Sequence, residues 1–273
     1  IKVVGISVYV QVFESTRGLK VGAEAEFTGH MLEVTLGPGM LSKNYDGLQN
    51  DLDKMDGVFL KRGQYTYPLD KERVWHFVPL VKVGDEVGPS AWLGQVDENF
   101  QPLKIMVPFQ LTGTYEVKSI VPEGDYTIED TVVVLTDREG KDIPVNMIQK
   151  WPVKKAMTNY KEKPRPYKLL ETGVRVIDTV NPIVEGGTGF IPGPFGTGKT
   201  VLQHAISKQA EADIVIIAAC GERANEVVEI FTEFPELVDP HTGRKLMERT
   251  IIIANTSNMP VAAREASVYT AMT

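Results

Sequence analysis

The run Gly193-Pro194-Phe195-Gly196-Thr197-Gly198-Lys199-Thr200 constrains the fold of this chain more than any other feature. It matches the pattern Gly-x-x-x-x-Gly-Lys-Ser/Thr, in which the backbone amides of a glycine-rich loop surround phosphate groups. The pattern requires a strand before the loop and a helix after it. A short apolar piece at 189–192 and an amphipathic pattern at 199–211 meet this requirement. The sequence therefore predicts an α/β core built around the loop.

The loop residues predict a binding site for a nucleoside triphosphate. Glycines let the backbone approach an anion closely, and the first amides of the following helix point at it. Lys199 then reaches the β- and γ-phosphate oxygens, and the Thr200 hydroxyl ligates Mg²⁺. An ordinary glycine-rich turn is the alternative. We expect ATP or ADP with Mg²⁺ as ligands, bound by Gly193, Pro194, Phe195, Gly196, Thr197, Gly198, Lys199, Thr200 and Val201.

A second group of polar residues follows the next apolar strand, at 214–219. Ligands of parallel sheets lie beyond the carboxyl ends of the strands, so Glu222 is expected to meet the phosphate loop there. A carboxylate facing a γ-phosphate is useful only if it orients and deprotonates a water between them. Arg223 would offset the repulsion and hold phosphate oxygens. The catalytic candidates are therefore Glu222, Lys199 and Arg223; the alternative is that Glu222 and Arg223 cap the next helix.

The sequence leaves the roles of Glu226 and Arg264 open, and it predicts a packing role for Cys220. Glu226 lies one helical turn beyond Glu222, where it either contacts the waters of Mg²⁺ or belongs to a solvated helix face. Arg264 either reaches a subunit boundary or forms a surface ion pair. Cys220 is the only cysteine, and we expect it to be a buried apolar side chain. A single cysteine allows no internal disulfide, which is typical of a reducing cytoplasm.

The pattern of the chain changes along its 273 residues, which are enough for more than one core. Alternating residues at 1–38 predict part of a β-barrel, followed by an irregular or helical connector at 39–58. Short strands between Gly- and Asp-rich turns predict a β-rich insertion, a small barrel or sandwich, at 59–151. A Pro- and Lys-rich linker follows at 152–170. Alternating strands and helices at 171–273 predict the first part of a RecA-like P-loop domain with a parallel sheet.

Individual elements follow from apolar alternation, apolar runs and turn residues. A turn is expected at 123–125 and another at 138–141. The expected strands are 4–12, candidates within 24–36, 81–87, 92–96, 104–107, 114–120, 131–135, 190–191, 214–219 and 250–254, and the expected helices are 172–180, 199–211, 223–232 and one opened by Pro260.

Composition and charge exclude several classes of protein. No apolar run approaches the roughly 20 residues that cross a bilayer, and the first residues carry no signal-peptide pattern. The formal net charge of −7 argues against broad binding to nucleic acid. The four histidines are scattered without metal-ligand spacing, so zinc is not indicated.

Several motifs together resemble the catalytic A subunits, or alpha chains, of archaeal and bacterial V-type (A-type) rotary ATP synthases. The bacterial or archaeal form is the nearer relative, because eukaryotic loops usually carry Cys where Thr197 stands. The resemblance covers essentially the whole chain. The residues that carry it are 36–39, 45–49, 149–153, 175–178, 193–200, 221–226 and 255–267.

The resemblance implies an alternating A3B3 hexamer with B subunits, a central stalk, peripheral stalks and a membrane sector. In that family ATP is hydrolysed or synthesised at the A/B interfaces, coupled to H⁺ or Na⁺ transport, and the head lies in the cytoplasm, peripheral to the membrane. The family's lysine, threonine, glutamate and arginine roles fall on Lys199, Thr200, Glu222 and Arg223. The block at 59–151 is similar to the insertion that distinguishes A from B subunits.

Relative to that family the chain looks truncated at both ends and its nucleotide-binding sheet incomplete, so we expect little ATPase activity from it alone. Two other functions remain open. One is a non-catalytic ring subunit, which the loss of Lys199 or Glu222 would have favoured. The other is a RecA-like hexameric helicase or termination motor, whose barrel stacks single-stranded nucleic acid in a basic groove. The acidic balance of the chain argues against the helicase.

Overall fold

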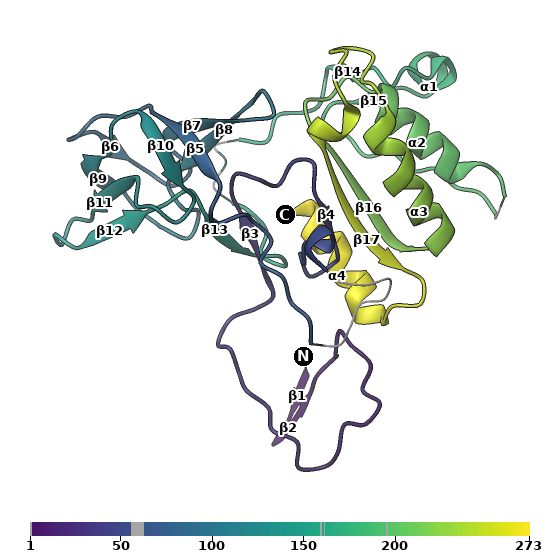
Figure 1. Ribbon diagram of the computed structural model, residues 1–273, viewed down its shortest axis with the longest axis horizontal. Helices are drawn as coiled ribbons and strands as arrows, with labels where there is room; N and C mark the ends of the chain where they lie inside the picture. The colour runs from purple at the N-terminus through teal and green to yellow at the C-terminus, as the bar shows by residue number, and fades with distance from the viewer. Residues whose placement is uncertain (1, 56–62, 159, 161, 195) are drawn as a thin grey trace.

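The parallel sheet behind the phosphate loop has the strand order β16-β17-β4. β16 and β17 contain continuous apolar runs, as expected where helices cover both faces of a sheet. Helices α2 and α3 lie on one face and α4 on the other (Figure 1). The structure is a computed structural model that describes residues 2–55, 63–158, 160, 162–194 and 196–273. The elements are β4 (Asn44–Tyr45), α2 (Lys199–Gln209), β16 (Val215–Glu222), α3 (Ala224–Glu233), β17 (Thr250–Thr256) and α4 (Val261–Met272), with 3-10 turns η2 (Phe234–Glu236) and η3 (Leu246–Arg249) between α3 and β17.

The core of this region forms where the apolar stripe of α3 meets the sheet. Val227, Ile230 and Phe234 are buried there against Ile252 and other residues of the strands. On the opposite face, α4 packs small side chains onto the sheet, which lets the helix approach it closely. The sequence predicted α2, α3, β16 and β17 to within a few residues, because their patterns are long, and it predicted a helix opened by Pro260 where α4 begins.

The third strand of the sheet comes from the segment that the sequence predicted as an irregular or helical connector. β4 pairs in parallel with β17, with Asn44 opposite Ile252 and Tyr45 opposite Ile253. Tyr45 is 1% exposed, and its hydroxyl donates to the carbonyl of Pro68 (2.9 Å). Burial, followed by the nearby Asp51 carboxylate, raises the pKa of Tyr45 above its usual range. The connector is thus an integral part of the α/β region.

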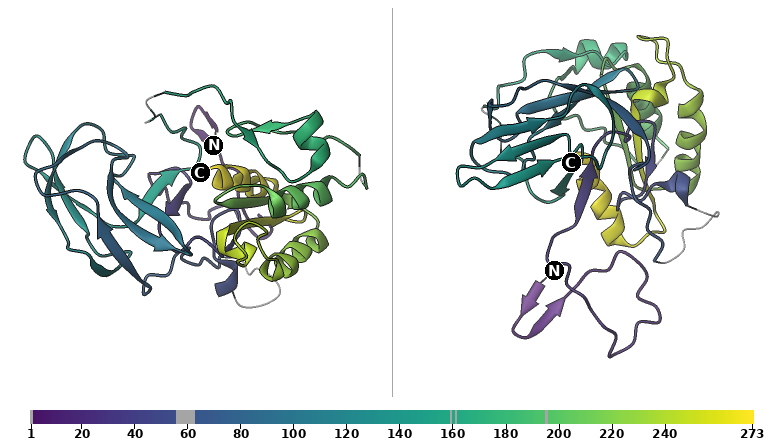
Figure 2. Two further views of the ribbon diagram at one scale, coloured as in Figure 1. Left: turned by 90° about the horizontal axis from the view of Figure 1, so that it is seen from above. Right: turned by 60° about the vertical axis from the view of Figure 1, so that its left-hand side comes forward.

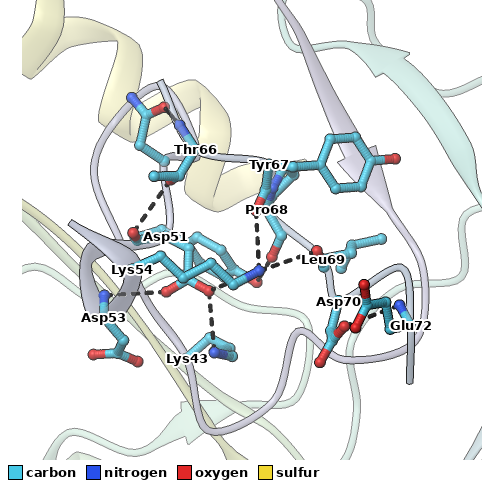
Figure 3. Close-up of polar contacts among 12 residues, drawn as sticks. Lys43, Asp51, Asp53, Lys54, Thr66, Tyr67, Pro68, Leu69, Asp70 and Glu72 are labelled. Carbon is cyan, nitrogen blue, oxygen red and sulfur yellow. Dashed lines mark hydrogen bonds and ion pairs between the residues drawn. The ribbon is translucent and has the colours of Figure 1, made fainter. Parts of the chain in front are cut away.

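The buried carboxylate of Asp51 stabilises the folded conformation of the connector (Figure 3). The side chain of Asp51 is fully buried and accepts a hydrogen bond from Lys43 Nζ (3.0 Å), with Lys54 Nζ at 3.7 Å. Lys54 Nζ also donates to the carbonyl of Leu69 (3.2 Å), and Thr66 Oγ1 donates to the carbonyl of Asp51 (3.2 Å). A buried carboxylate requires such partners. Asp51 therefore joins the short turn η1 (Leu52–Lys54) to the segment that enters the next region.

The β-rich region predicted as a small barrel or sandwich consists of two four-stranded antiparallel sheets, ordered β10-β5-β7-β8 and β12-β11-β9-β6. Side chains that alternate along the strands fill one core; Phe77, Leu93, Val117 and Leu135 are fully buried in it. The strands are β5 (Val74–Pro79), β6 (Glu86–Val87), β7 (Trp92–Glu98), β8 (Gln101–Met106), β9 (Tyr115–Ile120), β10 (Gly124–Thr127), β11 (Val133–Thr136) and β12 (Asp142–Val145).

The remaining elements are short antiparallel pairs. β3 and β13 pair at the point where the chain enters and leaves the β-rich region. The hairpin β1–β2 projects away from the rest of the molecule (Figure 2). Within the described residues no helix has the length and apolar character needed to cross a bilayer. These elements are β1 (Lys2–Val4), β2 (Ser7–Tyr9), β3 (Glu33–Leu36), β13 (Gln149–Pro152), β14 (Leu169–Leu170), α1 (Arg175–Val180) and β15 (Ile183–Val184).

Several expected strands are wrong in extent. The expected strand 4–12 is a hairpin broken at Gly5, whose φ of 59° suits a turn, and residues 10–12 are not in a strand. Of 24–36 only β3 is a strand. Of 81–87 only β6 is a strand, because the Asp85 side chain accepts from Lys82 N (2.7 Å) and closes a turn. The expected turn at 123–125 is instead the start of β10, paired with β5.

The expected strand 190–191, directly before the phosphate loop, is also wrong. A strand needs a neighbour for its backbone groups, and no strand among the described residues pairs with this segment. Phe190 is consequently 86% exposed. The loop therefore follows an extended but unpaired segment.

Candidate functional site

The phosphate loop leads directly into the N-terminus of α2. Gly198 is the N-cap residue, with a φ of 82° in the left-handed region that favours glycine. Thr197 Oγ1 donates to the carbonyl of Pro194 (2.8 Å) and closes the loop from within. A Cβ at Gly193 would lie 2.6 Å from Thr197 Oγ1, so the closed loop requires glycine there as well.

The loop leads into a helix as the sequence predicted, but without the expected strand before it, and its contacts with nucleotide stay a prediction. Gly193, Pro194, Gly196, Thr197 and Gly198 are exposed, and Lys199, Thr200 and Val201 form the first turn of α2. The amides of a first helical turn have no acceptor within the helix and are available to an anion. Phe195, the remaining residue expected to contact nucleotide, lies outside the described residues.

Glu222 is the last residue of β16, at the carboxyl end of the parallel sheet. The register of β16 against β17 shifts between Cys220 and Glu222, and Gly221 between them has a φ of 90°. Such a bulge re-aims the side chain that follows it. The carbonyl of Glu222 accepts from Ser257 N (2.8 Å), which anchors the bulge to the end of β17.

The side chains of Glu222 and Arg223 do not cap α3 by hydrogen bonds. The N-cap residue of α3 is Arg223, and no side chain there caps the helix by a hydrogen bond. Glu222 belongs to the strand rather than the helix. The alternative in which both residues cap α3 is therefore not the arrangement in the structure.

Glu226 faces the phosphate loop rather than solvent. Its Oε2 accepts a long hydrogen bond from Thr200 Oγ1 (3.4 Å), which connects the first turns of α2 and α3. Glu226 is partly buried and contacts the first turn of α2, while its expected contact with the waters of Mg²⁺ stays a prediction. Two carboxylates and one hydroxyl thus converge near the start of α2.

The electrostatics of the site keep Glu222 easily protonated. Burial, then a hydrogen bond with Glu226 and the repulsion of its charge, raise the pKa of Glu222. Lys199 acts in the opposite direction and lowers it. Glu226 and Lys199 therefore both lie close enough to Glu222 to influence its ionisation.

A cavity of about 290 Å³ lies between α2, α3 and β16, lined in part by Thr200, Glu222 and Glu226. His204, which the sequence analysis did not single out, also lines it. Burial, and secondarily the Lys208 ammonium, lower the pKa of His204. His204 lies four residues after Thr200, so helical spacing was the signal that could have placed both on one face.

The structure contradicts the expectation for Cys220 and leaves open whether Arg264 reaches a subunit boundary. Arg264 of α4 is half-buried, and a Cβ built on Gly221 would lie 3.0 Å from its Cδ. Its Nε has no hydrogen-bond partner among the described residues. Cys220 is exposed, so the prediction that it is buried is wrong. It lies on β16 together with Ile216, which is 49% exposed.

A glycine loop at a helix N-terminus and a carboxylate at the end of the neighbouring strand define a nucleotide-binding α/β protein. Models of one family match three parts of the chain. The ATP synthase alpha/beta family nucleotide-binding domain matches residues 173–273. The barrel-sandwich domain of ATP synthase alpha/beta subunits matches 66–154, and the beta-barrel domain of the family matches 1–29. The chain belongs to the ATP synthase alpha/beta family.

Comparison with individual curated proteins indicates a narrower group within this family. The chain is 56% identical to the V-type ATP synthase alpha chain of Treponema denticola, over all of this chain and 47% of that protein. It is 55% identical to the one of Borrelia hermsii, over 96% of this chain and 46% of the relative. The identity to the alpha chain of Borreliella burgdorferi strain B31 is 52%, over all of this chain and 48% of the relative. The chain thus spans about half the length of the curated relatives it matches, and the resemblance to V-type alpha chains is confirmed.

Proposed function

We propose that the chain is the nucleotide-binding part of a catalytic V-type alpha chain, which hydrolyses or synthesises ATP in a ring with B subunits. One observation carries the proposal: Thr200 of the phosphate loop and Glu222 at the strand end line the same cavity, with Glu226 in contact with Thr200. Names of relatives support the same assignment. Coupling to H⁺ or Na⁺ transport through stalks and a membrane sector, with the head in the cytoplasm, is part of this proposal.

The phosphate loop binds and orients the nucleotide. Backbone amides of residues 193–201 surround the β- and γ-phosphates, and the Lys199 ammonium neutralises part of their charge. The oxygen donors Thr200 and Glu226 fit the preference of Mg²⁺ for hard oxygen ligands, with Thr200 as ligand and Glu226 beside its waters. Bound Mg²⁺ supplies further charge neutralisation on the phosphate oxygens.

Glu222 acts on the attacking water. Its carboxylate orients the water in line with the γ-phosphorus and accepts its proton, which a group with a raised pKa holds more readily. Arg223, the next residue, binds phosphate oxygens and balances the charge of the carboxylate. The presence of Lys199 and Glu222 together favours a catalytic subunit over a non-catalytic one.

Glu222→Gln tests the proposal in the full-length protein assembled with its partner subunits. Nucleotide binding is retained, because the loop is untouched, whereas turnover falls roughly 100-fold or more through loss of the base. The control is Glu229→Gln, the same substitution at an exposed position of α3, which leaves turnover near that of the wild type. Turnover of the Glu222→Gln variant within twofold of the control would remove Glu222 from this role.

A further inference from the structure

Asn255 has no part in the proposed chemistry, yet it is buried beside the site at the end of β17. It is 2% exposed. Its Nδ2 donates to the carbonyl of Ala263 (2.9 Å) and to Ser267 Oγ (2.7 Å), both in α4. Ser267 Oγ also donates to the carbonyl of Ala263 (3.0 Å). One side chain of the sheet therefore holds the first two turns of α4.

The held part of α4 carries Arg264, the residue after Ala263. The Arg264 side chain packs on Gly221, where a Cβ would approach its Cδ to 3.0 Å and its guanidinium to 3.3 Å. Gly221 is the bulge residue from which the chain turns into Glu222. The helix thus supports the bulge from one side through a contact with its backbone.

A second contact reaches Glu222 from the same end of β17. Ser257, two residues after Asn255, donates its N–H to the carbonyl of Glu222 (2.8 Å). Cys220 and Asn255 are register partners across the two strands. Asn255 therefore lies at the point where β16, β17 and α4 meet, and these elements supply the contacts with the backbone of Gly221 and Glu222 described above.

We propose that Asn255 is a positioning residue for Glu222: it ties α4 to the end of β17 and so keeps Arg264 on the glycine bulge that aims the Glu222 carboxylate. The inference rests on the proposed role of Glu222 as the base. The tie acts through the Nδ2 donor alone, because Asn255 Oδ1 has no hydrogen-bond partner among the described residues. An error of an ångström in a reacting group lowers turnover by up to about 100-fold, so small shifts of α4 matter.

Asn255→Ala, in the full-length assembled protein, is the main test. It removes both bonds to α4, and kcat falls about 10- to 100-fold while the KM for ATP stays within about threefold. Ser267→Ala is a milder variant that removes one acceptor, with a smaller loss of kcat of about threefold. It keeps the test informative where Asn255→Ala folds poorly.

The matched control is Thr270→Val on the same helix. It deletes a buried hydrogen bond of similar kind, from Thr270 Oγ1 to the carbonyl of Gly47 (2.8 Å), without touching Arg264 or the bulge. A purely structural role predicts that Thr270→Val and Asn255→Ala lower kcat alike. That result, an effect of Asn255→Ala on KM alone, or an unchanged kcat would overturn the inference.

The double variant Glu222→Gln/Asn255→Ala separates this inference from the proposed function. If Asn255 acts through Glu222, its loss adds less than about twofold once the carboxylate is gone. Full additivity would show that Asn255 acts elsewhere, while Glu222 remains the base. Glu222→Gln turning over like the wild type would instead refute the proposed function itself.

Discussion

At the scale of single residues, Glu222 and Glu226 form a carboxylate pair in which Glu226 influences the ionisation of Glu222. Burial and the proximity of Glu226 raise the pKa of Glu222, and Lys199 opposes the shift. A general base works only while it is deprotonated. Turnover is therefore expected to rise as pH rises through the pKa of Glu222 and to be lost on the acid side.

Glu226→Gln should move the acid limb of the kcat–pH profile to lower pH. The substitution removes a negative charge next to Glu222 and leaves an amide that can donate to it, and both effects favour the charged carboxylate and lower its pKa. The profile is measured by steady-state ATPase assays of the assembled protein. Glu229→Gln, which removes the same charge farther along α3, leaves the limb in place. A limb that stays fixed or moves upward in Glu226→Gln would exclude the coupling.

The site residues predicted from the sequence share one property: the residues next to them in the chain are enough to identify them. Lys199 and Thr200 belong to a contiguous motif, and Glu222 follows directly after an apolar strand. Asn255 was visible only as part of a family motif, and His204 not at all. Their importance comes from contacts with residues of other elements, which no pattern of neighbours in the sequence encodes.

At the scale of elements, prediction succeeded where a strand or helix has its own strong pattern. The first four residues of β9, from Tyr115 to Lys118, alternate between buried and exposed, and this alternation is readable in the sequence. β4 has two residues, too few for a period, and exists because β17 offers a free edge. The expected strand at 190–191 fails for the opposite reason, since its pattern is suitable but no described strand pairs with it.

Gly47 shows how tightly the connector packs against α4. A Cβ there would lie 2.3 Å from Asn255 Nδ2 and 2.5 Å from Ser267 Oγ. Gly47→Ala should lower the free energy of opening of residues 43–51 by about 1–3 kcal/mol through overpacking, as measured by amide hydrogen exchange. Gly88→Ala is the control, because its Cβ would meet only the carbonyl of Gly113 at 3.9 Å. Equal exchange in the two variants would show that the contact adapts without cost.

At the scale of the whole molecule, the hairpin β7–β8 joins the β-rich region to the α/β region. Glu98, 3% exposed, accepts from Leu41 N through Oε1 (2.7 Å). Asn99 Nδ2 donates to Ser42 Oγ and to the carbonyl of Glu248, both at 2.9 Å. The hairpin tip thus bonds to the segment before β4 and to the turn before β17. Because β4 and β17 belong to the sheet that ends in Glu222, the two regions are connected through the framework of the site.

Asn99→Gly should loosen this connection while both cores remain folded. Asn99 has a φ of 46°, which glycine adopts readily, so the turn is kept and only the two bonds are lost. Each buried hydrogen bond contributes about 1 kcal/mol. The free energy of opening of residues 41–43 should therefore fall by roughly 1–3 kcal/mol in hydrogen exchange measured by mass spectrometry.

The control for this variant is Ser90→Gly, which also places glycine at a positive φ (61°) of the β-rich region but whose hydroxyl bonds only locally, to Pro89. It should leave exchange at 41–43 unchanged. The buried core residues Val117 and Leu135 should exchange at wild-type rates in both variants, since their sheets are intact. If exchange at these core positions rose in Asn99→Gly as much as at 41–43, the hairpin would be stabilising its own region rather than fastening it to the sheet. If neither rose, the two bonds would contribute nothing, and the regions would be held together by other contacts, such as the bond from Leu41 N to Glu98, the paired strands β3 and β13 and the contacts of Asp51.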